Sequence, residues 1–141
     1  MLEFHQQVVL ANSAINNLES FHEKFLAAIE SAEKASDKIG SLSVLSNTIC
    51  CSCLGHKVNA THRPIAVNGK LNVLEYDFST NWKDQNVSTL RIYLQADGVL
   101  TCDVEGKNKL CDFNNTYIQN QILVTVSWSL LKSVVFAPNE G

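Results

Sequence analysis

The sequence predicts an α+β domain with a long helix first, an antiparallel meander of four to five strands next, and a helix packed on one face of that sheet last. Three observations predict it. Residues 1–40 carry apolar side chains at helical spacing, residues 56–114 alternate apolar strands with tight turns, and residues 115–136 return to helical spacing. The chain has 141 residues, of which 45% are hydrophobic, so we expect a single domain over 1–141.

The first helix is predicted over residues 1–40, ending at Gly40, a residue that favours helix termination. Its apolar positions recur at alternating spacings of four and three, which is a heptad-type seam along one face. The seam consists of Phe4, Val8, Ala11, Ile15, Leu18, His22, Phe25 and Ile29. Such a helix is roughly 50 Å long, whereas a domain of this size has a radius of gyration of about 14 Å. We therefore expect it to overhang its own domain.

Two arrangements relieve this overhang. The helix breaks near Asn16 and Asn17, where helix propensity is poor, or a second copy of the chain covers the protruding apolar side chains. We favour the second, so the eight seam residues are the candidate interface of a homo-oligomer, a dimer or larger. For His22, the ordinary interpretation is a neutral ring that faces the partner or the core, and the alternative is a pH-sensitive interface.

A short helix is predicted within residues 41–55, because four apolar side chains share one helical face and Ser41 and Gly55 suit its two ends. Residues 56–64 are polar and irregular and predict a loop. Pro64 suits the beginning of an edge strand better than its middle.

The strongest hairpin signal is Asn68-Gly69, because both residues tolerate a positive φ and apolar runs flank them. The following strand runs to Phe78. Its apolar parity changes at Val73-Leu74, which a β-bulge reconciles. Residues 79–87 predict a polar loop that carries one tryptophan.

A second hairpin is predicted around the three-residue loop 96–98, with Gly98 in the left-handed conformation. This loop pairs Leu94 with Leu100, whereas a two-residue turn would pair apolar with polar positions. The same register places Arg91 opposite Asp103. Residues 110–113 predict a further short strand.

Residues 117–135 are ambiguous, because their apolar side chains alternate as in a strand and also step by four as in a helix. The length of the segment and the stop at Pro138 favour a helix. The content of β-branched residues favours a strand. We predict the helix.

The chemical motifs point away from catalysis. Cys50 and Cys53 have the spacing of half a zinc site, but no second pair follows at a matching distance, so we expect no metal or other cofactor. Four carboxylates on the predicted outer face of the sheet could serve acid–base chemistry, and a solvated face that includes Arg91 is the better interpretation. These carboxylates are Glu75, Asp77, Asp103 and Glu105. Neither a nucleophile motif nor a phosphate-binding glycine loop is recognised.

Composition and targeting signals limit the partners and the compartment. The net charge of −3 and the scattered 11 lysines and arginines predict no binding to nucleic acid. We expect neither a secretory leader nor a membrane span, because the most apolar stretch, 122–136, is interrupted by polar residues. Five cysteines cannot all pair within one chain, which favours the reducing cytoplasm.

Two functions remain after these exclusions. We favour a non-catalytic, self-associating interaction or adaptor module, and an enzyme is the less favoured class. The alternative is a small-molecule-binding protein or enzyme with an apolar pocket between the sheet and the helices. The candidate lining residues of that pocket are Tyr76, Trp82, Tyr93 and Trp128.

Overall fold

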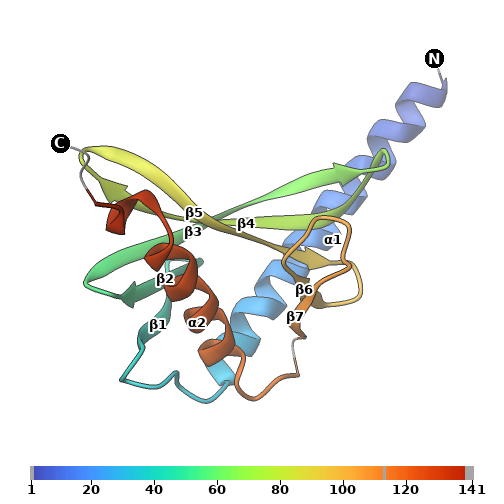
Figure 1. The fold of residues 1–141 in the computed structure, drawn as a ribbon. Coiled ribbons are helices and arrows are strands. Elements are labelled where there is room, and N and C mark those ends of the chain that lie inside the picture. The colour runs from blue at the N-terminus through green and yellow to red at the C-terminus, as the bar shows by residue number, and fades with distance from the viewer. Residues whose placement is uncertain (1, 113, 139–141) are drawn as a thin grey trace.

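The computed structural model describes residues 2–112 and 114–138 and has an α+β fold (Figure 1). In chain order the elements are α1 (Leu2–Ser31), β1 (Gly40–Leu45), β2 (Thr48–Cys53), β3 (His56–Val67), β4 (Lys70–Trp82), β5 (Gln85–Gln95), β6 (Val99–Thr101), β7 (Lys109–Asp112), α2 (Ile118–Leu131) and the 3₁₀ turn η1 (Val134–Phe136). The seven strands form one antiparallel sheet in sequential order. The predicted fold class is confirmed, but the predicted count of four to five strands is too low.

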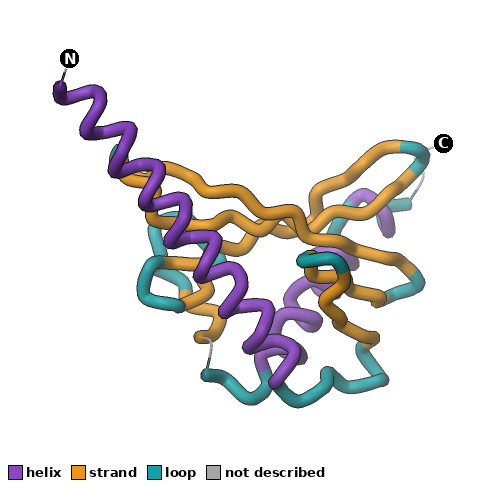
Figure 2. The backbone as a smooth tube through the Cα atoms, turned by 180° about the vertical axis from the view of Figure 1, so that it is seen from behind, coloured by secondary structure: helices purple, strands orange, loops and turns teal. Residues whose placement is uncertain are grey.

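Both helices pack on the inner face of the curled sheet, and their chain termini lie at opposite corners of the molecule (Figures 1 and 2). The core joins α1, α2 and the inward side chains of the strands. Its largest fully buried members include Phe25 from α1, Tyr76 and Phe78 from β4, and Ile122 and Leu123 from α2. The inner face of the sheet therefore positions both helices.

Four successive hairpins turn through two residues that both have positive φ. These turns are Ser46-Asn47, Leu54-Gly55, Asn68-Gly69 and Lys83-Asp84. Positive φ at both central positions defines the type I′ turn, whose twist matches that of the flanking strands. Asn68-Gly69 has the composition that favours this turn, and the hairpin predicted there is confirmed by the pairing of Val67 with Lys70.

The segment predicted as a short helix over 41–55 is instead the β1–β2 hairpin. Its buried side chains alternate along each strand, as in Ile49, Cys51 and Cys53 of β2. Gly40 lets the two strands approach, because a Cβ at this position would clash with the carbonyl oxygen of Ser52. Three of the four apolar residues that suggested a helical face, Leu42, Ile49 and Cys53, point into the core from the two strands, and the fourth, Leu45, is 61% exposed.

The loops predicted over 56–64 and 79–87 are strands and a tight turn. Residues 56–64 form the first part of β3. Pro64 is tolerated there because β2 pairs with residues 56–59 alone, so β3 has only β4 beside it at Pro64. In the segment 79–87, β4 extends to Trp82 and β5 begins at Gln85, so the loop between them has only two residues.

The bulge and the second hairpin are close to their predicted places. The register between β3 and β4 leaves Asn72 as the extra residue, immediately before the predicted Val73-Leu74. Leu94 pairs with Leu100 as predicted, and Gly98 has a φ of 83°. The predicted pairing of Arg91 with Asp103 is wrong.

The actual partners explain that error. Arg91 lies opposite Asp77 on β4, and Asp103 caps the turn after β6 by accepting the backbone N–H groups of Lys107 and Asn108. These hydrogen bonds lower the pKa of Asp103 below its usual range. β7 ends at Asp112, and Phe113 of the predicted strand 110–113 lies outside the described residues.

The helices differ from their predicted lengths. α1 is continuous through Asn16 and Asn17 but ends at Ser31, before the predicted end at residue 40. Met1 of that predicted helix lies outside the described residues. The helix predicted over 117–135 is confirmed as α2. No helix within residues 2–112 and 114–138 is both long and apolar enough to cross a membrane.

Candidate functional site

Exposure along the seam of α1 rises from its buried C-terminal half, through a half-buried middle, to its exposed N-terminal end. Leu18, His22, Phe25 and Ile29 are at most 3% exposed against the sheet and α2. Ala11 and Ile15 are half-buried. Phe4 and Val8, by contrast, are 64% and 67% exposed, and Figure 1 shows that this end of α1 projects beyond the sheet. We define residues 3–17 as the overhang.

A groove of about 680 Å³ runs between the overhang and the turn that joins β3 to β4. Both views place that hairpin beside the N-terminal half of α1 (Figures 1 and 2). The helix wall consists of Phe4, Gln7, Val8, Leu10, Ala11 and Ala14, and the hairpin wall of Gly69, Lys70, Leu71 and Asn72. The groove is open, and its surface is mainly apolar.

The overhang carries few charges. Glu3 and His5 are its ionisable residues, and its other polar side chains are amides and one hydroxyl. Interface cores between proteins are depleted of charged residues in the same way and enriched in aromatic side chains. Val9 and Leu10 add further apolar surface, at 52% and 69% exposure. The overhang therefore combines a low content of charge with exposed apolar side chains.

The overhang also has weak intrinsic helix propensity. Its 15 residues include three asparagines, two valines and one isoleucine, all of which favour a helix less than alanine or leucine does. An isolated helix of about 12–15 residues is marginal in water even with better residues. A segment of this kind depends for its helical structure on the rest of α1, with which it is continuous, and on packing of its apolar face.

His22 is buried by its own chain and not by a partner. Its Nε2 lies 3.2 Å from the carbonyl oxygen of Asn47, which can only accept, so Nε2 carries the proton. Its Nδ1 lies 2.7 Å from the Tyr76 hydroxyl, which therefore donates to it. The His62 ring stacks on His22 with centroids 3.7 Å apart, and His62 Nε2 lies 3.4 Å from Glu19 Oε1.

Burial dominates the electrostatics of this cluster. It lowers the pKa of His22, and the neighbouring His62 lowers it further. Burial also raises the pKa of Tyr76 far above its usual range. Both groups are 1% exposed. The neutral forms are thus the ones that the fold accommodates.

The four aromatic residues predicted to line a pocket lie in separate places. Tyr76 faces α1 on the inner side of the sheet, and Tyr93, which pairs with Glu75, faces the outer side. Trp82 lies half-buried near the end of β4, with its ring 6.2 Å from that of His56. Trp128 is 58% exposed on α2. The structure does not gather them around one space.

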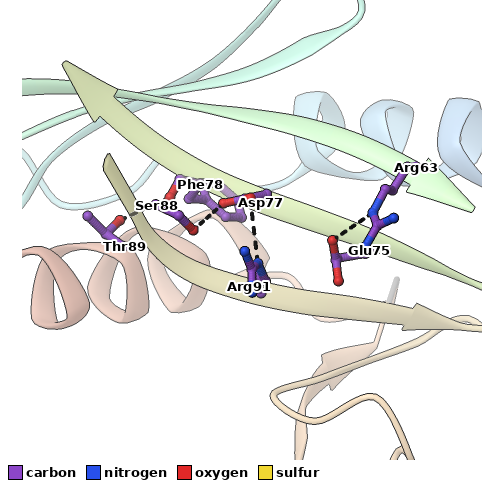
Figure 3. A network of polar contacts seen from close by, with 7 residues as sticks. All are labelled: Arg63, Glu75, Asp77, Phe78, Ser88, Thr89 and Arg91. Carbon is purple, nitrogen blue, oxygen red and sulfur yellow. Dashed lines mark hydrogen bonds and ion pairs between the residues drawn. The ribbon is translucent and has the colours of Figure 1, made fainter. Parts of the chain in front are cut away.

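Two of the four predicted outer-face carboxylates, Glu75 and Asp77, are paired with arginines (Figure 3), whereas Asp103 caps the turn after β6 and Glu105 pairs with Lys107. Arg63 Nε lies 3.0 Å from Glu75 Oε1, and Arg91 Nε lies 3.5 Å from Asp77 Oδ2. Ser88 also donates a hydrogen bond to Asp77. The pairs bridge β3, β4 and β5, so their arrangement is that of cross-strand ion pairs rather than of an acid–base site.

The cysteines are distributed over the sheet. Cys51 and Cys53 point into the core, and Cys111 is buried at the β7 edge. Burial raises the pKa of Cys51 and of Cys111 to about 12, so both thiols stay protonated at neutral pH. Within the described ranges no group of three histidine, cysteine or acidic side chains is placed to hold a metal ion.

Sequence reasoning identified the apolar face of the overhang but missed the hairpin wall of the groove. The Asn68-Gly69 turn was recognisable, yet nothing in its sequence says that its tip lies beside α1. The partners of His22 were missed for the same reason, since His62 and Tyr76 meet it only through the pairing of β3 with β4. Comparisons with models of protein families, with curated proteins and with solved structures found no match, so no family is assigned to this chain.

Proposed function

We propose that this protein is a non-catalytic interaction module that associates with copies of itself through the overhang of α1. The observation that carries this proposal is the exposure of Phe4 and Val8 at the N-terminal end of an apolar seam whose members from Leu18 to Ile29 are buried. Phe4 and Val8 continue the same face that packs on the sheet from Leu18 onward. Water contact of such a patch is unfavourable, and patches of this kind mark interaction sites.

A second copy is the occupant that fits the charge of the overhang. In a two-fold dimer the same surface meets itself, so a surface rich in one charge would repel its copy. With one carboxylate and one histidine in residues 3–17, two overhangs can pack side by side without such repulsion. The groove beside the hairpin supplies space for apolar side chains of the partner helix. We place the protein in the cytoplasm, where the five free cysteines persist as thiols.

The test is Val8→Glu, measured by native mass spectrometry and by size-exclusion chromatography with light scattering. Val8 is 67% exposed in the protomer, so the charge should leave the fold intact and yield a smaller particle than the wild type. Leu18→Glu or Phe25→Glu would not separate association from folding, because both residues lie in the protomer's own core.

Ser13→Glu is the matched control, because Ser13 is exposed on the side of α1 opposite the seam. This variant should keep the size of the wild type. A wild type that is monomeric at all concentrations, or a Val8→Glu particle of unchanged size with native circular dichroism, contradicts self-association through the overhang.

Small-molecule binding is the second candidate, and the volume of the groove favours it. About 680 Å³ lies within the range of about 300–1,000 Å³ found for ligand pockets, and apolar side chains line most of it. A monomer that carries a co-purified apolar adduct, lost in Val8→Glu, would favour this function. An oligomer without an adduct would favour the first.

A further inference from the structure

We propose that the His22–His62 stack is an acid-sensitive latch between α1 and the sheet: it holds this part of α1 while His22 is neutral and releases it when His22 is protonated. The stack joins α1 to β3, and its rings lie 3.7 Å apart at an interplanar angle of 14°. The proposal concerns the buried half of α1 and does not depend on self-association.

In the neutral form of His22, both ring nitrogens have a hydrogen-bond partner. Its Nε2–H donates to the carbonyl oxygen of Asn47 in the β1–β2 turn, and its Nδ1 accepts from the Tyr76 hydroxyl of β4. The Tyr76 proton thereby has an acceptor at a site that is 1% exposed. One tautomer therefore ties α1 to two elements of the sheet.

The protonated form loses this arrangement. A proton on Nδ1 would face the Tyr76 hydroxyl, which must then rotate and leave its own proton without the acceptor it had. The ring would also become a buried cation, 1% exposed, against a second imidazole. Protonation thus acts against the contacts that hold α1.

His62 is the more exposed ring of the pair. Its side chain is 22% exposed, and its Nε2 lies 3.4 Å from the Glu19 carboxylate one turn before His22 on α1. The groups that face His22 are therefore His62 from β3, Tyr76 from β4, Asn47 from the β1–β2 turn and Glu19 from its own helix. Glu19 is the only carboxylate among these four, and its contact is with His62.

The pH window follows from the direction of the shift. Burial lowers the pKa of His22 in the docked state, so the undocked state binds the proton more readily. Docking is fully stable above the ordinary pKa of about 6.5. Below that value the docking equilibrium constant falls by up to about tenfold per pH unit, until the pKa of docked His22 is reached.

Hydrogen bonds at the C-terminal end of α1 limit how much of the helix can leave the sheet on protonation of His22. The Gln119 side chain of α2 donates to the Ile29 carbonyl oxygen at 2.7 Å and accepts from the Ala35 N–H at 3.3 Å. Neither of these hydrogen bonds involves an ionisable group. Acid should therefore loosen α1 around residues 18–25 first, while its C-terminal end stays tied to α2.

The test is NMR of the imidazole nitrogens and of amide exchange at pH 7.5 and pH 5.5. We expect His22 as the Nε2–H tautomer at pH 7.5, and a fall of up to about tenfold in the protection factors of Phe25 and Leu26 at pH 5.5 relative to Leu94 of β5. In His22→Phe this pH-dependent difference should vanish. His5→Gln, at an exposed position outside the groove, should behave as the wild type.

A second variant keeps the test informative where His22→Phe does not fold. His62→Phe replaces the imidazole beside His22 by an uncharged aromatic ring, so the pKa of His22, which the His62 interaction lowers, should rise toward its ordinary value. An unchanged pKa of His22, an equal acid response in His22→Phe, or a uniform loss of protection across α1 and β5 would each overturn the latch.

Discussion

Replacing Phe25 by alanine should lower the free energy of unfolding by about 3–5 kcal/mol, the cost of deleting a buried phenyl ring and leaving a cavity. Phe25 is 0% exposed, and its ring packs edge-on against Tyr76 at a centroid distance of 5.1 Å. The ring thus joins the buried half of α1 to the middle of the sheet. Urea denaturation followed by circular dichroism at pH 7.5 measures the change.

Phe4→Ala is the matched control on the same helix. Phe4 is 64% exposed, so its truncation should change the unfolding free energy of the protomer by about 0.5 kcal/mol or less. Measurements at two protein concentrations separate this term from any loss of association. Equal losses of unfolding free energy in the two variants would contradict the burial of Phe25 and the exposure of Phe4 in the protomer.

The second large effect is expected at Gln119. Gln119→Leu keeps the volume of the side chain but removes the two hydrogen bonds that join α2 to the Ile29 carbonyl and the Ala35 N–H. Gln119 is 6% exposed, so water cannot replace either bond fully. The Ala35 N–H would lose its acceptor, whereas the Ile29 carbonyl oxygen would still accept from the Ala32 N–H at 3.3 Å, so we expect a loss of about 1–3 kcal/mol in chemical denaturation.

Gln121→Leu controls for the chemistry of the substitution. Among the described residues the Gln121 side-chain oxygen is buried without a hydrogen-bond partner. Its removal should therefore cost less than about 1 kcal/mol or stabilise the protein slightly. A Gln121→Leu variant as unstable as Gln119→Leu would mean that the loss reflects the helix surface and not the two bonds.

Local sequence rules found the turns whose residues suit their backbone. Asn68-Gly69 and Gly98 supply positive φ at low cost, and both hairpins were predicted in register. Ser46-Asn47 and Lys83-Asp84 adopt the same kind of turn with less typical residues, so their segments were predicted as a helix and a loop. There the pairing of long strands, and not the turn residues, decides the backbone.

The candidate site was predictable on one side only. The spacing of Phe4 and Val8 identifies an apolar helix face, because periodicity is a local property of the chain. The point at which that face leaves the sheet depends on where the β3–β4 hairpin lies against α1, which is an arrangement of distant parts of the chain. The His22 cluster combines residues 54 positions apart in the chain, and no local pattern encodes it.

The order of the elements has a consequence for synthesis on the ribosome. Each strand pairs with the one made just before it, so the sheet can assemble as it emerges, through short loop closures. α1 is made first, yet its tie to Gln119 spans 90 residues. At translation rates of about 5–20 residues per second, the nascent helix waits roughly 5–20 s for that contact. During this interval the side of α1 that packs on α2 is not yet covered by its own chain and is open to chaperones and to neighbouring chains.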